Sequence, residues 1–164
     1  MRVTLSDLKI VGAVAAMLLV AACETSSDGA GAGTSYGGGT AGGYEQTGTQ
    51  QDLAVNVGDR VQFGYDRYSL TVAARGVLER QAAWLKNNGG TKVVIEGHCD
   101  ERGTREYNLA LGERRASTVK SYLVALGIAD GRVSTISYGK ERPIAFGSND
   151  GDWAKNRRAV TVVQ

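Results

Sequence analysis

The 164-residue sequence has little proline, cysteine and histidine: one Pro, two Cys and one His. Two Cys can form one disulfide at most, and a zinc site made of Cys and His alone needs more of them. The sequence also lacks a P-loop and a Rossmann fingerprint, so it gives no indication of a nucleotide cofactor. With 19 basic and 17 acidic residues, the net charge of +2 does not indicate nucleic-acid binding.

The first 22 residues predict a secretory signal peptide. Arg2 and Lys9 give a positively charged start, and residues 10–22 form an unbroken run of 13 small or apolar residues. A bilayer-spanning helix needs about 20 such residues, so the run fits a signal h-region. The small residues before Cys23 resemble the lipobox of bacterial lipoproteins, which implies a lipid anchor on Cys23. A simple cleavage site with a chance Cys is the alternative.

Residues 23–54 predict a flexible tether behind the lipidated Cys23. Residues 24–54 contain 9 Gly and 8 Ser or Thr, and they show no apolar periodicity. Such a segment buries too little apolar surface to offset the entropy of ordering it. The 23 Gly of the chain are therefore concentrated partly in a segment that we expect to be unpacked.

Residues 55–164 are predicted to form one folded domain with 17 basic and 12 acidic residues. Hydrophobic periodicity predicts helices at 71–87 and 105–126, and β-rich runs predict strands at 61–63, 91–97, 133–138 and 159–163. Thr104 is the expected N-cap of the second helix and Gly127 its C-terminal stop. A short helix or turn is expected at 150–155. Alternating strands and helices predict an α/β (α+β) two-layer sandwich.

A polar loop, residues 98–103, joins the second predicted strand to the long helix. Loops at the carboxyl ends of strands, next to a helix N-terminus, are frequent binding positions. Gly97 and Gly103 bracket this loop, and the absence of a side chain would let the backbone approach a ligand closely. We therefore expect the loop to border a binding site.

The long helix carries a charged residue where its buried face requires an apolar one. Asn108, Leu111 and Arg115 fall on one face at helical spacing, so the Arg115 guanidinium needs an anion or water. Its planar fork suits a carboxylate, while Asp100 in the preceding loop would suit an ammonium. The pattern fits a ligand that carries both groups. An internal salt bridge between Asp100 and Arg115, in a purely structural lipoprotein, is the alternative.

Several runs of the domain resemble a known family. Six residues resemble the peptidoglycan-binding motif of OmpA-like domains: Asp100, Gly103, Asn108, Leu111, Arg115 and Ala116. The runs 63–66, 96–108, 111–116, 137–143 and 156–160 resemble the peptidoglycan-associated lipoproteins in particular, in the same order along the chain. This resemblance implies the OmpA-like fold, a mixed four-stranded sheet with helices packed on one face.

The resemblance also implies a function. The positions of Asp100 and Arg115 would hold the meso-diaminopimelate of the peptidoglycan stem peptide, without catalysing a reaction, and Tyr65 and Asp66 would border the same pocket. The implied protein partner is TolB of the Tol system. The lipid on Cys23 would place the protein at the outer membrane, with its domain in the periplasm.

Three residues complicate this interpretation. Glu24 directly follows the predicted lipidated Cys, a position that influences membrane sorting. Cys99 has no expected intramolecular partner, so it is either a small buried side chain or the donor of an intermolecular disulfide. His98 and Cys99 also suggest a cell-wall hydrolase or amidase, but neighbouring strand residues point to opposite faces, which favours a hydrogen-bonded structural histidine.

Overall fold

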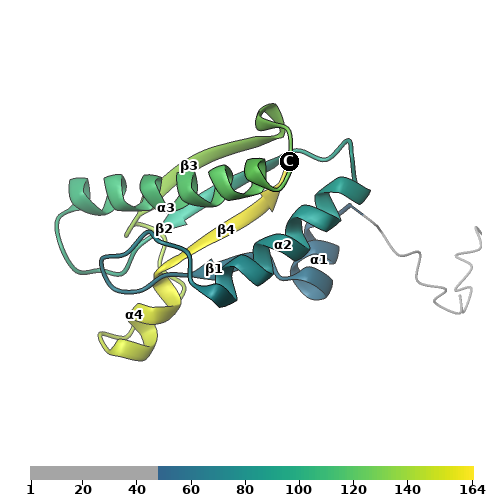
Figure 1. Ribbon diagram of the computed structural model, residues 1–164. Helices are drawn as coiled ribbons and strands as arrows, with labels where there is room; N and C mark the ends of the chain where they lie inside the picture. Colours follow the sequence, from purple (N-terminus) through teal and green to yellow (C-terminus); the bar gives the residue numbers. More distant parts are fainter. Residues whose placement is uncertain (1–47) are drawn as a thin grey trace, which may run out of the picture. The chain divides into compact units, whose positions relative to one another are not determined.

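The computed structural model describes residues 48–164 of the chain. The predicted signal peptide, Cys23, Glu24 and most of the predicted tether lie outside these residues. The described part is an α/β fold around one mixed four-stranded sheet, with the strand order β1-β4-β2-β3 (Figure 1). The strands are β1 (Arg60–Gln62), β2 (Val93–His98), β3 (Val133–Gly139) and β4 (Arg158–Val163). The helices are α1 (Gln50–Asp52), η1 (Leu53–Val57), α2 (Val72–Asn87), α3 (Arg105–Ala125), η2 (Asp130–Arg132) and α4 (Asp150–Asn156).

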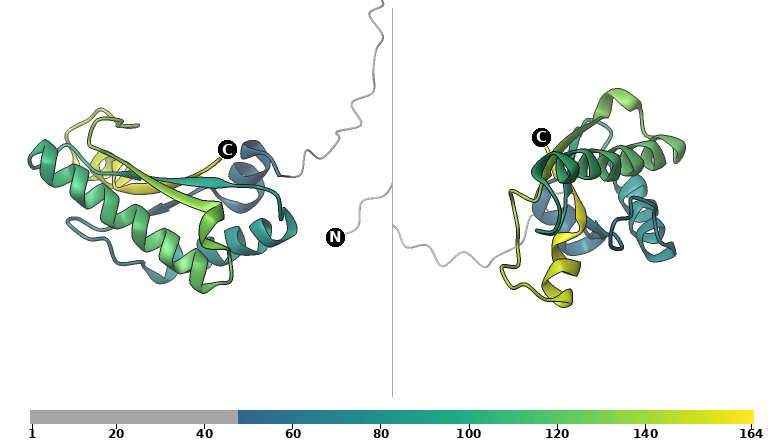
Figure 2. Two further views of the ribbon diagram at one scale, coloured as in Figure 1. Left: turned by 90° about the horizontal axis from the view of Figure 1, so that it is seen from above. Right: turned by 90° about the vertical axis from the view of Figure 1, so that its left-hand side faces the viewer.

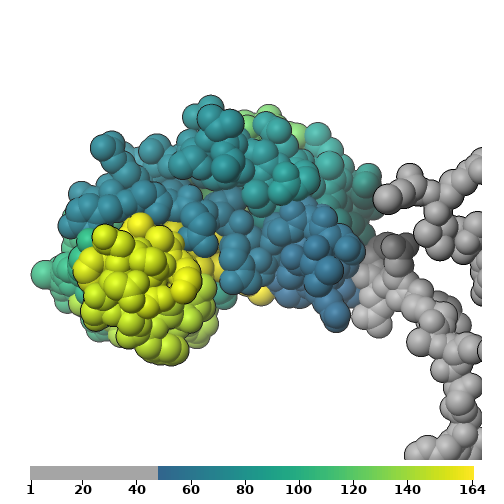
Figure 3. Space-filling model, turned by 90° about the horizontal axis from the view of Figure 1, so that it is seen from below, coloured from purple at the N-terminus to yellow at the C-terminus, as the bar shows by residue number. Residues whose placement is uncertain are grey.

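The sheet topology confirms the predicted fold class. β4 pairs antiparallel with both β1 and β2, and β3 pairs parallel with β2. The two long helices, α2 and α3, cover one face of the sheet, as the two views of Figure 2 show. Figure 3 shows α4 and the loop before it at one end of the molecule, and α1 with η1 at the other end. No helix within residues 48–164 is long and apolar enough to cross a membrane.

Each long helix has a threonine as its N-cap residue. The Thr71 hydroxyl accepts a hydrogen bond from the backbone N–H of Ala74 (3.1 Å), and Thr104 does the same for Tyr107 (3.2 Å). Each hydroxyl thus satisfies one of the N–H groups that a helix start leaves unpaired. α3 ends before Gly127, whose φ of +95° is a conformation that favours glycine. The predicted start and stop of α3 are therefore confirmed.

α3 approaches β2 closely where two glycines face each other. A Cβ atom on Gly97 would overlap the carbonyl group of Gly112, and one on Gly112 would overlap the Ser137 hydroxyl. At Gly97 only hydrogen fits, because the overlapping atoms are backbone, whereas a Cβ on Gly112 would push the Ser137 side chain aside. The two glycines therefore let the helix backbone lie against the strand. The sequence suggested that Gly97 lets the backbone approach a ligand closely. In the structure, Gly97 instead lets α3 pack closely against β2.

The hydrophobic core lies between the sheet and the two long helices. Alternate residues of β2, such as Val93 and Ile95, point into it and are fully buried. The core is made of these buried residues: Leu53, Val61, Phe63, Ala74, Leu78, Ala82, Trp84, Leu85, Val93, Ile95, Ala116, Val119, Leu123, Ile128, Val133 and Ala159. It holds the ends of β2 and α3 in a fixed relation, and both elements contribute to the site described below.

The folded part begins earlier than the predicted boundary at residue 55. Leu53 is fully buried in the core. The Gln50 side chain continues the sheet beyond β1, because its amide donates to the carbonyl of Thr161 (3.3 Å) and accepts from the N–H of Val163 (2.8 Å). Residues 48–54 therefore belong to the domain and not to the tether. A single buried leucine in a polar, glycine-rich stretch gives no periodic signal, which is why the sequence analysis missed it.

Candidate functional site

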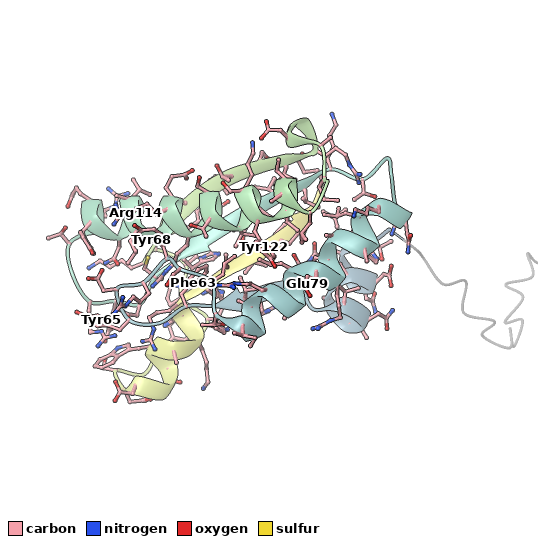
Figure 4. The ribbon with its side chains drawn as sticks, viewed as in Figure 1. Phe63, Tyr65, Tyr68, Glu79, Arg114 and Tyr122 are labelled. Carbon is pink, nitrogen blue, oxygen red and sulfur yellow. The ribbon has the colours of Figure 1, made fainter. Side chains whose placement is uncertain are left out.

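A cavity of about 200 Å³ lies where β2 ends and α3 begins. Three segments line it: the connection from β1 to α2, the loop after β2, and the first turns of α3. The lining residues are Tyr65, Asp66, Cys99, Asp100, Arg102, Gly103, Tyr107, Asn108, Leu111 and Arg115. All seven residues that the sequence analysis selected for ligand binding therefore meet at one cavity. Figure 4 labels Tyr65 on the segment that runs between α3 and α4.

Asn108 and Gly103 shape the loop that forms one wall. Asn108 is buried, and its amide Nδ2 donates to the carbonyl oxygens of Arg102 (2.8 Å) and Thr104 (3.1 Å). Gly103 has a φ of +89°, which favours glycine at this position. These two residues fix the backbone that carries Asp100 and Arg102, so their contribution to the cavity is to position it.

Arg115 is fully buried and holds two parts of the cavity wall together. Its Nε donates to the carbonyl of Arg67 (2.8 Å) and its Nη2 to that of Gly64 (3.1 Å). Its Nη1 donates to the carbonyl of His98 (2.7 Å) and to Cys99 Sγ (3.4 Å). Burial lowers the pKa of Arg115 from its ordinary value. The guanidinium is thus a desolvated cation that reaches main-chain oxygens instead of a carboxylate.

Asp100 is also buried, and it pairs with other arginines. Arg102 Nη2 lies 2.6 Å and Arg157 Nη1 3.2 Å from Asp100 Oδ2. Burial raises the pKa of Asp100, but the hydrogen bonds from Arg102 and Arg157 outweigh it and hold the pKa below its usual value. The alternative internal salt bridge between Asp100 and Arg115 is therefore wrong for the described structure, because each group has other partners.

Two further contacts lie beside the cavity. The Arg102 guanidinium lies between the rings of Tyr65 and Trp153, with its carbon 4.1 Å from each ring centre. The Tyr107 hydroxyl donates a hydrogen bond to Asp66, which joins the β1–α2 connection to α3 and raises the pKa of Tyr107. Asp66 has a φ of +52°, an uncommon conformation for a residue other than glycine.

Comparisons with known proteins match this architecture. The model of the OmpA family matches residues 62–157. The chain is 44% identical to "Peptidoglycan-associated lipoprotein" of Rhizobium meliloti (strain 1021), over 98% of this chain and 90% of that one. The chain belongs to the OmpA family and, within it, to the peptidoglycan-associated lipoproteins.

Solved structures agree with this assignment. The crystal structure of the peptidoglycan-associated lipoprotein from Burkholderia pseudomallei is 42% identical, with a TM-score of 0.63, and the match covers 65% of this chain and 90% of that one. The C-terminal domain of Helicobacter pylori MotB is 21% identical, with a TM-score of 0.61 over 65% of this chain and 84% of that one, which is a likeness of fold alone. The OmpA-like fold is thereby confirmed.

Four residues in or beside the cavity were not predicted from the sequence: Arg102, Tyr107, Trp153 and Arg157. Tyr107 and Arg102 lie inside the motif region, and the spacing of Asp100 and Arg102 is a local signal for an ion pair. Trp153 and Arg157 come from α4 and its end, about 50 residues further along the chain, so only the tertiary fold brings them to Asp100.

Cys99 and His98 do not form a catalytic pair. The Cys99 thiol is buried, lies 3.3 Å from the carbonyl oxygen of Asn108, and has its pKa raised by burial to about 11. A thiol with that pKa is protonated at neutral pH, when a nucleophile would need to be a thiolate. The His98 ring lies elsewhere, 5.6 Å from the ring of Tyr138.

The prediction that His98 is a hydrogen-bonded structural histidine is wrong. Its ring is buried, yet neither ring nitrogen has a hydrogen-bond partner among residues 48–164. Glu96 Oε2 is 3.4 Å from Nε2 without forming a hydrogen bond. Burial and the nearby cations, Arg158 first among them, lower the pKa of His98 to about 3. The imidazole is therefore neutral, and its contribution to the site is the carbonyl that binds Arg115.

Proposed function

We propose that this chain is an outer-membrane lipoprotein that binds peptidoglycan non-covalently and links the membrane to the cell wall. The relatives that support this carry "Peptidoglycan-associated lipoprotein" as their name. In this proposal Cys23 carries the lipid, residues 24–47 form the tether, and the domain faces the periplasm. Glu24 permits sorting to the outer membrane.

One observation carries the ligand assignment: Asp100 and Arg115 line one cavity without pairing with each other. A buried carboxylate and a buried guanidinium that face the same space suit a ligand with an ammonium and a carboxylate close together. The side-chain centre of meso-diaminopimelate in the stem peptide has that pair of groups. Four donors of Arg115 already bind the protein, so its remaining N–H and its unneutralised charge would attract the carboxylate.

The protein partner in this proposal is TolB, and the cellular context is the Tol-Pal system that supports envelope integrity and cell division. This part rests on the family resemblance. The protein would act by binding, because the protonated thiol of Cys99 and the unpaired ring of His98 do not provide an activated nucleophile. A cell-wall hydrolase or amidase is the competing function, and release of muropeptides from sacculi would reveal it.

The test is co-sedimentation of the full-length protein with purified sacculi. Asp100→Asn keeps the size of the side chain and removes its charge, so we expect the bound fraction to fall at least tenfold. Asp59→Asn is the matched control, because Asp59 is also buried and paired with a neighbouring arginine, Arg60 (2.7 Å), but does not line the cavity. If Asp100→Asn sediments like the wild type, the ligand assignment is wrong.

A separate test addresses the anchor. The full-length protein and a Cys23→Ser variant are expressed with labelled palmitate and separated into inner-membrane, outer-membrane and soluble fractions. We expect label and outer-membrane location for the wild type and neither for the variant. Labelled protein in the inner membrane would contradict the proposed sorting.

A further inference from the structure

Asp100 already accepts as many hydrogen bonds as a carboxylate can. Its Oδ1 accepts from the backbone N–H of Arg102 (3.2 Å) and from Arg102 Nε (3.3 Å), and its Oδ2 accepts from Arg102 Nη2 (2.6 Å) and Arg157 Nη1 (3.2 Å). An ionised carboxylate has about four acceptor positions. A ligand ammonium can therefore reach Asp100 only by replacing a donor that is already there.

The Arg102 side chain is the donor that can leave. Arg157 is less exposed, at 14% against 31% for Arg102, and its Nε is held by the carbonyl of Phe63 at 3.1 Å. Among residues 48–164, the only hydrogen-bond acceptor of the Arg102 side chain is Asp100. Breaking that pair releases the Arg102 side chain without disturbing another hydrogen bond.

Two aromatic rings flank the Arg102 guanidinium while it binds Asp100. The rings of Tyr65 and Trp153 lie on its two sides, each 4.1 Å from the guanidinium carbon. Aromatic faces attract a guanidinium without consuming its N–H donors. Tyr65 is 62% exposed, so the two rings form a site at the cavity mouth that is open to water. The rings occupy none of the Arg102 N–H donors and the side chain is 31% exposed, so these donors can turn to water when they leave Asp100.

We infer that Arg102 is an internal competitor that occupies the ammonium site on Asp100 until a cationic ligand displaces it. This inference rests on the proposed function of the cavity and assigns a specificity-determining residue to it. A ligand without a cation cannot replace Arg102 and leaves Asp100 capped. The free domain consequently keeps its buried carboxylate neutralised, and the cavity discriminates against neutral and purely anionic ligands.

The test measures binding of the soluble tripeptide L-Ala-γ-D-Glu-meso-diaminopimelate to the full-length protein in detergent by calorimetry. Arg102→Gln is expected to bind about threefold more tightly than the wild type, because partly exposed ion pairs contribute little free energy. Arg102→Lys keeps a cation beside Asp100 and is expected to gain less. Arg105→Gln is the matched control. This substitution also removes one charge and one ion pair, the one with Glu141 at 3.3 Å, but Arg105 does not contact Asp100.

A second ligand tests the contribution of the side-chain ammonium group by itself. The same tripeptide, acetylated on its side-chain amine, is expected to bind equally to the wild type and to Arg102→Gln. Equal or weaker tripeptide binding by Arg102→Gln would overturn the inference, as would an equal gain in Arg105→Gln or a gain for the acetylated peptide. If wild type binds but Arg102→Gln shows no gain, only this inference fails. If neither protein binds the tripeptide, the proposed function fails and this inference fails with it.

Discussion

Arg115 Nη1 donates a hydrogen bond of 2.7 Å to the main-chain carbonyl oxygen of His98. The contact joins the middle of α3 to the last residue of β2, while the other guanidinium nitrogens bind the β1–α2 connection. A residue that the sequence analysis selected for ligand binding is therefore also what holds the cavity wall together. This structural role can be tested separately from the proposed ligand binding.

Replacing Arg115 should destabilise the fold. Arg115→Lys cannot reproduce the planar fork that reaches the carbonyl oxygens of Gly64, Arg67 and His98 together, and we expect it to lower the free energy of unfolding by about 2–4 kcal/mol. Urea denaturation followed by circular dichroism measures this. Arg114→Gln, at the exposed neighbouring position, should change stability by less than about 0.5 kcal/mol. Equal stability of Arg115→Lys and wild type would show that the buried contacts are unimportant.

The glycine contact between α3 and β2 predicts a position that tolerates no side chain. Gly97→Ala places a methyl group on the Gly112 carbonyl, and because both partners are backbone, we expect insoluble or unfolded protein. Gly76→Ala is the opposite case. Its added Cβ meets nothing within 4 Å, and a helix interior favours Ala over Gly by about 0.5–1 kcal/mol. The yield of soluble protein and circular dichroism test Gly97→Ala, and a thermal melt is expected to show a higher midpoint for Gly76→Ala than for the wild type.

Leu53 tests where the domain begins. Leu53→Ala removes a fully buried side chain, so we expect a loss of about 2–5 kcal/mol in the free energy of unfolding. Val55→Ala, two residues later and 74% exposed, should have little effect. A boundary at residue 55, as the composition suggested, would instead make Leu53→Ala neutral in denaturant titrations.

The single histidine of the chain gives an unambiguous NMR probe. Because the pKa of His98 is lowered to about 3, its ring proton resonances should stay constant between pH 8 and pH 5 in the folded protein, and titrate near pH 6.5 in urea. The sign follows from linkage. The lowered pKa contributes stability that is complete above pH 6.5 and is lost as the pH falls toward 3. A titration near pH 6.5 in the folded protein would contradict the burial of the ring.

Local patterns predicted much of this fold because local chemistry determines it. The helix periodicity, the Thr104 cap and the Gly127 stop are all decided by residues within one or two turns of each other. The same holds for the shared face of Asn108, Leu111 and Arg115. The partners of these residues are not local, however. Arg115 binds carbonyls that any residue could supply, so no sequence pattern marks them.

The electrostatic partners of Asp100 also could not be predicted from the local sequence. Arg102 is two residues away, but its position between Tyr65 and Trp153 depends on segments that are far apart in the sequence. The short helix α1 escaped the analysis for a different reason. The helix is stabilised by the hydrogen bonds of the Gln50 side chain to β4 and by the burial of Leu53, which directly follows it, in the core. Its own three residues are too few to form a stable helix.

The Gln50 contact with β4 also defines how the domain would respond to tension. α1 lies at one end of the sheet and the segment that carries Tyr65 lies near the other (Figures 1 and 4). If the proposed lipid anchor and the proposed wall contact at the cavity both hold the chain, the pull on the described domain would run roughly along the strands. Hydrogen bonds between strands are then sheared together and not opened one at a time. The domain would consequently resist best a pull that runs along its strands.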